Sequence, residues 1–412
     1  MPALTRLTLR AGAPILAAVT LLASCGLSSA MTSIVVDVET GKVLSQDQAS
    51  DRWYPASTTK LMTAYIALRR VSAGEIALDM PVVMTRDAAA AVPSKMGYEP
   101  GSVIRLDNAL RMLMVKSAND VAIAIGQALA PDGSVETFVS SMNAEAARLG
   151  MRDTRFINPN GLPGEGQHSS AKDLAILGAA IRREFPAFKD YFATEAISTG
   201  EVTMKNYNSL LGHYAGADGM KTGYICASGF NLVASATRGD RTLVAVVLGA
   251  EGPIVRARVA AELLENGFKA DLAKVEQTVE ALPASSGPPA DISSTICSAE
   301  GRTARANERE AEVGREDTFG SPYMTALDRP LVTVPVSLGG AAARGDIEAG
   351  ISLIAAYGIP LPTPRPDRPG EAAPDAATAA VAPPETIPSE VSPSAATTVE
   401  DAGEGDAAPA RN

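Results

Sequence analysis

The chain has 412 residues, 46% of them hydrophobic, and a formal net charge of −11. It carries enough apolar side chain to bury a sizeable core, and its acidic balance argues against a nucleic-acid-binding protein, which needs an excess of lysine and arginine. His168 and His213 are the only histidines, and no cluster of Cys and His has metal-ligand spacing. We therefore expect no metal and no cofactor.

Residues 1–30 have the pattern of an export signal. Two arginines precede an apolar stretch, residues 13–23, that is too short to span a bilayer. Two processing sites fit: a lipobox ending at Cys25, which would become the lipidated first residue, or cleavage after Ala30. Both predict a protein that works outside the cytoplasm, in the periplasm or cell envelope. Lipidation at Cys25 would attach it to a membrane.

After the signal, the chain begins as a hairpin and continues as a series of helices. Residues 34–38 and 43–44 are strand-like and are separated by turn residues. Pro55 precedes a helix whose first turn contains residues 57–60. Further helices are expected at 107–115, at 121–129, from an N-cap at Ser134 to a stop at Gly150, and from a capping box at Ser170–Asp173 to the residue before Pro186.

The pattern returns to strands after Gly216. Strands are expected at 219–225, 230–237 and 242–248, followed by a closing helix from Pro253 to Glu265 that ends at Asn266–Gly267. Strands at both ends with helices between them predict an α/β domain at residues 31–268. Its antiparallel sheet is formed from both ends of the domain, around a mostly helical insertion.

The remainder of the chain is less regular. Residues 269–358 predict a linker or a small β-containing region, with a charged helix or linker at 299–316 and a β-rich stretch at 331–338. Residues 359–412, with nine carboxylates against three arginines, predict a disordered acidic tail rich in Pro and Ala.

Two cysteines, Cys226 and Cys297, remain in the mature chain. Cysteines in an oxidising compartment can pair, but their spacing does not establish a bond. The alternative is two separate thiols. Both interpretations stay open at this point.

Ser57 and Lys60 form the first of three short motifs. A serine hydroxyl is a weak nucleophile unless a base removes its proton. Residues three apart on a helix share a face, so the Lys60 amine can reach the Ser57 hydroxyl. The amine acts as a base only when it is neutral, which burial and a second nearby cation such as Lys221 favour. Alone, Ser-x-x-Lys usually marks only an exposed helix start.

The second and third motifs follow in order. Ser117 and Asn119 lie between two predicted helices, where a bend would aim both side chains into one cleft. Residues 221–223 (Lys-Thr-Gly) lie in a predicted strand. Each motif alone is common, and its ordinary meaning is turn or strand-end composition. The three in this order are far more specific, because each falls on the element that its chemistry needs.

The order of the motifs is the signature shared by class A β-lactamases and penicillin-binding proteins. Over residues 34–267 the sequence resembles the low-molecular-mass penicillin-binding proteins of the D-alanyl-D-alanine carboxypeptidase type, peptidase family S11. The resemblance covers somewhat more than half of the chain. The matching phrases are residues 54–57, 156–162, 168–174 and 229–237.

The resemblance implies a role for each catalytic residue. Ser57 would attack the carbonyl between the two terminal D-alanines of a peptidoglycan stem peptide, and Lys60 would take its proton. Ser117 and Asn119 would relay protons and hold the peptide. The backbone N–H groups of Ser57 and Tyr224 would bind the oxyanion.

The resemblance also implies the substrate-binding residues. Lys221 and Thr222 would lie near the terminal carboxylate of the substrate, and Arg256 would be a second carboxylate-binding cation. Gly223 would let the substrate backbone approach as an added strand. Tyr224 stands where some relatives carry His.

We therefore expect a serine-type D-alanyl-D-alanine carboxypeptidase with β-lactams as covalent inhibitors at Ser57. A class A β-lactamase is disfavoured, because no Glu-x-x-Leu-Asn motif lies between the second and third motifs. A Ser-His-Asp triad using His168 is disfavoured by the lack of a Gly-x-Ser-x-Gly elbow. A D,D-endopeptidase with the same residues and a non-catalytic, β-lactam-binding wall module remain the alternatives.

Overall fold

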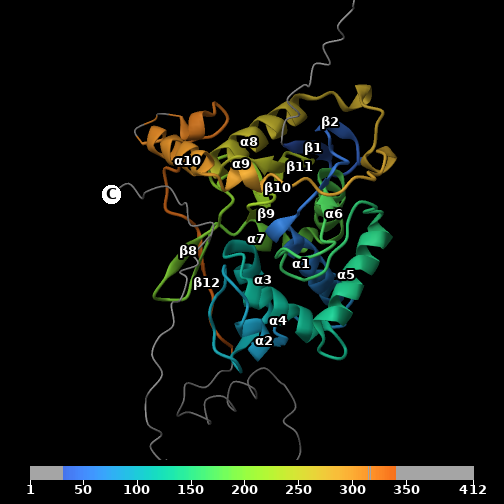
Figure 1. Ribbon diagram of the computed structural model, residues 1–412, viewed down its shortest axis with the longest axis vertical. Helices are drawn as coiled ribbons and strands as arrows, with labels where there is room; N and C mark the ends of the chain where they lie inside the picture. The colour runs from blue at the N-terminus through green and yellow to red at the C-terminus, as the bar shows by residue number, and fades with distance from the viewer. Residues whose placement is uncertain (1–30, 314, 316, 340–412) are drawn as a thin grey trace, which may run out of the picture.

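The computed structural model describes residues 31–313, 315 and 317–339 (Figure 1). The predicted export signal with Cys25, residues 340–358 of the predicted linker and the predicted tail at 359–412 lie outside the described residues. Within the described part, none of the helices combines the length and the apolar character needed to cross a membrane.

A five-stranded antiparallel sheet built from both ends of the domain forms the centre of the fold. Its strand order is β2-β1-β11-β10-β9, and Ile34 in β1 lies opposite Val246 in β11. This arrangement confirms the predicted α/β class, with strands from both ends of the domain around a helical insertion. The strands are β1 (Thr32–Asp37), β2 (Val43–Asp47), β9 (Ala217–Ile225), β10 (Gly229–Arg238) and β11 (Arg241–Ala250).

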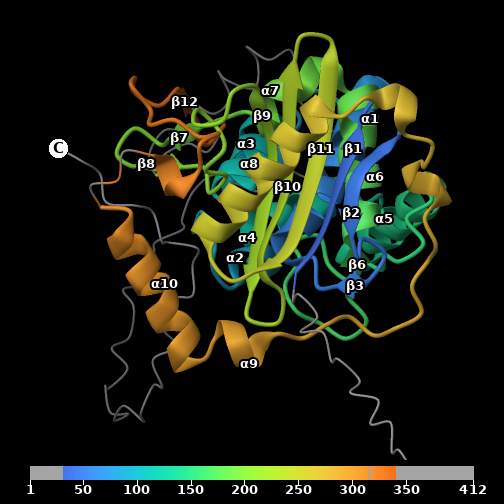
Figure 2. The ribbon, with the colours of Figure 1, turned by 90° about the horizontal axis from the view of Figure 1, so that it is seen from above.

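Helices cover both faces of this sheet (Figure 2). On one face, Gly178 of α6 (Ala171–Glu184) packs against Val244. On the other face, α8 (Pro253–Lys269) packs against Leu243. Because successive strand residues point to opposite faces, Leu243 and Val244 belong to two separate core layers. Burial of both faces explains why the central strands are almost continuously apolar.

The helical insertion lies between β2 and β9. Its predicted caps are confirmed: the Ser134 Oγ accepts from the Thr137 N–H and the Ser170 Oγ from the Asp173 N–H, and Gly150 ends α5 with a φ of 80°. The helices are η1 (Ala56–Thr59), α1 (Lys60–Ser72), α2 (Arg86–Ala89), α3 (Leu106–Val115), α4 (Asn119–Leu129), α5 (Val135–Leu149), α6, η2 (Pro186–Phe188) and α7 (Lys189–Phe192).

Three small sheets complete the described part. They are the pair β3 (Arg52–Trp53) and β6 (Ser169–Ser170), the pair β4 (Pro81–Val83) and β5 (Val103–Arg105), and the sheet of β7 (Ala196–Ser198), β8 (Thr203–Lys205) and β12 (Thr333–Pro335).

Residues 270–339, here called the C-terminal segment, follow α8 and lie against the main sheet and the insertion between β2 and β9 (Figures 1 and 2). The Val43 N–H donates to the Gln277 carbonyl at 2.9 Å, and β12 pairs in parallel with β7. A disulfide joins Cys226 to Cys297 with an S–S distance of 2.00 Å. The segment contains η3 (Leu272–Lys274), η4 (Val279–Ala281), α9 (Ser293–Ile296), α10 (Ala299–Ala311), η5 (Thr318–Gly320) and β12.

The expected end of the closing helix is wrong. α8 continues through Gly267 to Lys269. A Cβ on Gly267 would lie 2.9 Å from Leu243 Cδ1 and 3.0 Å from Val35 Cγ1. This glycine therefore serves close packing of the helix on the sheet and is not a stop signal.

Gly267→Val is expected to lower the free energy of unfolding by about 1–3 kcal/mol, because the added side chain overpacks the layer between α8 and the sheet. Asn266→Val, at the exposed neighbouring position of the same helix, is the matched control and should change stability by less than about 0.5 kcal/mol. Urea unfolding of both variants measures the difference. Equal effects at the two positions would contradict the packing role of Gly267.

Candidate active site

The first motif lies where η1 passes into α1. Lys60 is fully buried, and its Nζ lies within hydrogen-bond distance of the Ser57 Oγ, at 2.9 Å. The side-chain contact expected from the three-residue spacing is therefore present. Ser57 is only half-buried, so its hydroxyl is accessible while the amine behind it is shielded from water.

The Lys60 amine also joins two other parts of the chain. It donates to the Asn119 Oδ1 at 2.7 Å and to the Asn160 carbonyl at 2.6 Å. The Asn119 Nδ2 in turn donates to the Val92 carbonyl at 2.9 Å. The contact with Asn160 was not predicted from the sequence, because a backbone oxygen leaves no mark on the residue type. Residues 156–162 carry part of the family resemblance, which assigns no role to Asn160.

Gly161 explains how the loop that contains Asn160 comes so close to η1. It has a φ of +85°, and a Cβ there would lie 1.9 Å from the Ala56 carbonyl oxygen. Only glycine combines this backbone conformation with so short an approach. No role was predicted for Gly161 from the sequence.

Ser117 occupies the bend between α3 and α4. Its φ of 60° is uncommon for a residue other than glycine. Its Oγ is buried and has no hydrogen-bond partner among the described residues. A buried hydroxyl without a partner is unfavourable in the free protein, and such backbone conformations often occur at functional sites. Both features suit a group that acts on a bound substrate.

The third motif lies on β9, the edge strand of the main sheet, against η1. A Cβ on Gly223 would lie 2.9 Å from the Ser57 backbone N. This brings the β9 backbone at Gly223 next to the N–H of the serine, and Tyr224 is the following residue of the strand. Lys221 and Thr222 are both buried, and the Lys221 Nζ donates to the Thr222 carbonyl at 2.9 Å.

A cavity of about 230 Å³ lies between the first two motifs and the end of β9. Of the predicted site residues, Ser57, Ser117, Asn119 and Tyr224 line it. The other lining residues are Pro93, Ser94, Gly161, Leu162, Tyr207, Ile225 and Cys226. None of the described lining residues is an acid. A larger groove of about 860 Å³ between α5 and residues 151–157 contains none of the motifs.

Arg256 and His168 lie outside the cavity wall. Arg256 is buried, and its guanidinium donates to the carbonyls of Tyr207 at 2.9 Å and Asn231 at 3.3 Å. Arg256 therefore contacts Tyr207, which lines the cavity. Binding of a carboxylate by Arg256 stays a prediction. The His168 Nδ1 lies 2.8 Å from the Gly166 carbonyl. The described residues hold no group of three or more Cys, His, Asp or Glu suited to a metal.

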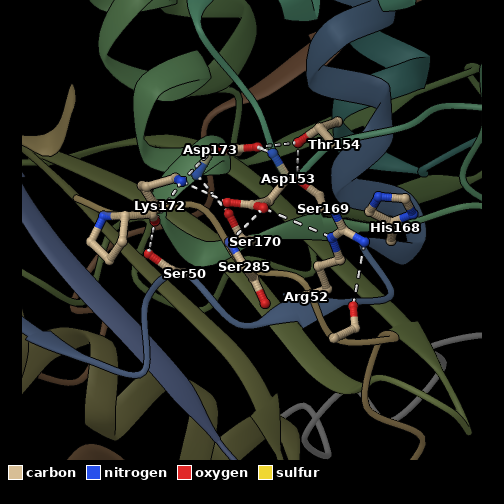
Figure 3. Close-up of polar contacts among 12 residues, drawn as sticks. Ser50, Arg52, Asp153, Thr154, His168, Ser169, Ser170, Lys172, Asp173 and Ser285 are labelled. Carbon is tan, nitrogen blue, oxygen red and sulfur yellow. Dashed lines mark hydrogen bonds and ion pairs between the residues drawn. The ribbon is translucent and has the colours of Figure 1, made fainter. Parts of the chain in front are cut away.

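A buried ionic cluster lies at the base of the loop that carries Asn160 (Figure 3). The Lys172 Nζ forms an ion pair with the Asp153 Oδ2 at 2.6 Å, and the Asp173 Oδ2 accepts from the Asp153 N–H at 2.7 Å and from the Thr154 hydroxyl at 2.8 Å. The side chains of Lys172, Asp153 and Asp173 are almost completely buried. The cluster therefore fixes the start of the loop to the first turn of α6.

Burial raises the pKa of Asp173 from 3.8 to about 6, against the opposing effects of the Thr154 hydroxyl and the Lys172 ammonium. Desolvation disfavours the charged carboxylate more than these partners favour it.

Comparison with known proteins gives consistent matches. A family model described as D-alanyl-D-alanine carboxypeptidase, peptidase family S11, matches residues 23–252. The chain is 35% identical over 243 residues to the D-alanyl-D-alanine carboxypeptidase DacC of Escherichia coli K12, which covers 57% of this chain and 60% of DacC. It is 33% identical over 245 residues to DacF of Bacillus subtilis 168, covering 58% and 62%. The match thus spans less than two thirds of these relatives.

Solved structures agree. Penicillin-binding protein 6B of Escherichia coli has a TM-score of 0.55 and 36% sequence identity, and the match covers 58% of this chain and 77% of that one. Penicillin-binding protein D2 of Listeria monocytogenes, in its ampicillin-bound form, has a TM-score of 0.52 and 29% identity, covering 57% and 96%.

We expect the stability of the wild type relative to Asp173→Asn to fall by about 2–3 kcal/mol between pH 4 and pH 7. The folded-state pKa of Asp173 lies above its value of 3.8 in the unfolded chain, so folding favours the protonated form. The resulting stability is fully present below pH 3.8 and is lost as pH rises through 6. The asparagine variant does not titrate. Urea unfolding at four pH values measures the difference.

Asp132→Asn is the control for this experiment. Asp132 is exposed, and the Thr137 hydroxyl lowers its pKa, so the wild type should not lose stability relative to this variant as pH rises from 4 to 7. A pH-independent difference for Asp173→Asn would show that Asp173 is ionised throughout.

Proposed function

We propose that this chain, which belongs to the D-alanyl-D-alanine carboxypeptidase family of peptidases (family S11), is a serine hydrolase that removes the terminal D-alanine from peptidoglycan stem peptides. The observation that carries the proposal is the buried Lys60 amine, 2.9 Å from the Ser57 Oγ. Beside it lies a cavity lined by residues of the first two motifs and by Tyr224, the residue that follows the third motif on β9.

Lys60 acts as the base. A neutral amine has two N–H donors and one lone pair. If the two donors bind the Asn119 Oδ1 and the Asn160 carbonyl, the lone pair is left facing the Ser57 hydroxyl. Complete burial disfavours the charged form of an amine, which supports this assignment.

The reaction follows from this geometry. The Ser57 Oγ attacks the carbonyl carbon between the two D-alanines as its proton passes to Lys60. The N–H groups of Ser57 and Tyr224 stabilise the oxyanion, an effect worth about 3–4 kcal/mol for one such donor. The proton then moves, with Ser117 as the relay, to the amine of the leaving D-alanine as the C–N bond breaks. Water hydrolyses the ester and restores the Ser57 hydroxyl.

The substrate binds along the open edge of β9. Lys221 and Thr222, which precede Gly223 on that strand, bind the terminal carboxylate, with Arg256 as a second cation behind the wall. An extended peptide added to a strand edge gains backbone hydrogen bonds. The lack of a side chain at Gly223 keeps that edge close to Ser57. Cutting of cross-links as a D,D-endopeptidase would use the same groups.

The family acts on the cell wall, outside the cytoplasm. The export pattern in residues 1–30 supports a periplasmic or envelope location, and lipidation of Cys25 would add a membrane anchor. A β-lactam-binding module without catalysis is disfavoured, because a binder would not need Lys60 in contact with Ser57.

Ser57→Ala should reduce D-alanine release from a muropeptide pentapeptide by at least about 10³-fold, since the acyl-enzyme cannot form. Ser140→Ala, which changes an exposed serine on α5, should leave release unchanged. Released D-alanine is measured with purified protein. A folded, penicillin-reactive wild type that releases none would overturn the carboxypeptidase and favour the non-catalytic module, and release only from cross-linked dimers would favour the endopeptidase.

A penicillin should acylate Ser57 and remain attached, because none of the described residues lining the cavity is an acid that could activate the deacylating water. Intact-protein mass spectrometry after removal of free drug should show one adduct that persists much longer than one turnover of the peptide. Ser57→Ala should show none. Rapid loss of the adduct with continued penicillin hydrolysis would indicate a β-lactamase.

A further inference from the structure

We propose that the Cys226–Cys297 disulfide, with the stretch of the C-terminal segment that ends in it, forms part of the site that recognises the substrate upstream of its terminal D-alanines. The inference rests on the proposed function. Cys226 lines the cavity directly after β9, and Cys297 follows α9. The match to the family model ends at residue 252, so Cys297 lies beyond the matched region.

The direction of the substrate places its upstream part at this disulfide. With the terminal carboxylate beside Lys221 and Thr222 and the reacting carbonyl beside the Tyr224 N–H, the rest of the peptide must continue along β9 towards Ile225 and Cys226. An extended chain advances about 3.3 Å per residue, so the residue before the two D-alanines comes to lie near Cys226. Both Ile225 and Cys226 line the cavity.

Besides the disulfide, two direct contacts join the C-terminal segment to residues 224–227, at the end of β9 and in the turn after it. The Ile292 N–H donates to the Ala227 carbonyl at 3.1 Å, which fixes the turn after β9. The Tyr224 hydroxyl lies 3.3 Å from the Cys297 Sγ. The aromatic side chain that borders the cavity is therefore in contact with the disulfide itself.

A third contact supports the same side chain from behind. The Tyr224 and Phe230 rings lie 4.3 Å apart, and the guanidinium of Arg305, from α10, lies 5.5 Å from the centre of the Phe230 ring. Arg305 is 8% exposed, so α10 contributes to this packing and is not wholly solvated. Tyr224 thus contacts the C-terminal segment directly at Cys297 and indirectly, through Phe230, at Arg305.

The part of the C-terminal segment that leads to Cys297 is also held at residues 285–290, away from the disulfide. The Ser285 N–H donates to the Asp153 Oδ1 at 2.8 Å (Figure 3), and the Ala290 N–H donates to the Arg52 carbonyl at 3.1 Å. Opening the disulfide therefore leaves the segment attached at residues 285–290. The expected consequence is local: the Tyr224 side chain and the turn after β9 lose their fixed position. The Tyr224 backbone, which pairs with Phe230 of β10, and the contact between Lys60 and Ser57 are retained.

The disulfide can be opened chemically. A dithiol reductant gives two protons and two electrons to the sulfur atoms, forming two cysteine thiols while the reductant becomes a cyclic disulfide. Both cysteines are half-buried, so a small dithiol can reach them. The variant Cys226→Ser/Cys297→Ser reproduces the open state permanently.

The test compares a long and a short substrate. We expect reduction, or Cys226→Ser/Cys297→Ser, to lower kcat/KM for a pentapeptide ending in D-Ala-D-Ala by at least about tenfold, since misplacement by 1 Å can cost 10²-fold. For N-acetyl-D-Ala-D-Ala, which is too short to reach Cys226, the change should stay within about twofold. Reductant should have no further effect on the double variant. Ser294→Ala, an exposed change on α9, should leave both values unchanged.

The outcomes separate the two proposals. Equal losses on both substrates would assign the disulfide a purely structural role and overturn the inference, as would no loss on either substrate when thiol titration shows the bond to be open. In both cases the proposed function stands. A wild type that releases no D-alanine from either substrate overturns the proposed function, and the inference with it.

Discussion

The hydrogen bonds of one buried amine hold the candidate active site together. The Lys60 Nζ contacts Ser57 in the preceding turn η1, Asn119 at the start of α4 and the carbonyl of Asn160 in a distant loop. A buried amine without partners is strongly unfavourable, so each of these segments stabilises the fold by satisfying it. The same requirement aligns Ser57, the second motif and the loop around one cavity. Stability and reactivity therefore depend on the same three distances.

Two glycines make this convergence sterically feasible. Gly161 lets the loop approach the Ala56 carbonyl, and Gly223 lets β9 approach the Ser57 N–H. Side chains at these positions would push the loop and the strand away from η1. The ionic cluster around Asp153 and Lys172 then fixes the start of the loop at a distance from the reacting atoms. The site is thus shaped as much by missing side chains and remote charges as by the polar groups that line it.

The sequence predicted the parts of this molecule that depend on residue type and spacing. These include the two-ended sheet, the caps at Ser134 and Ser170, and the contact of Lys60 with Ser57. It did not predict what depends on backbone atoms or on close packing. The Asn160 carbonyl leaves no mark on residue type, and Gly267 resembles a helix stop although it serves contact with Leu243. The pairing of Cys226 with Cys297 also required the path of the C-terminal segment, which composition alone could not give.

The position of β1 has a consequence for how the chain folds. β1 lies second from one edge of the sheet, and its inner neighbour, β11, is the last strand of that sheet along the chain. Such pairing between distant residues must wait for a large loop to close, which slows folding. During synthesis, β1 has only β2 to pair with until β11 has emerged. A truncated chain that ends before β11 would leave an apolar strand edge open to other chains. The sheet that supports Ser57 is therefore among the last features to become stable.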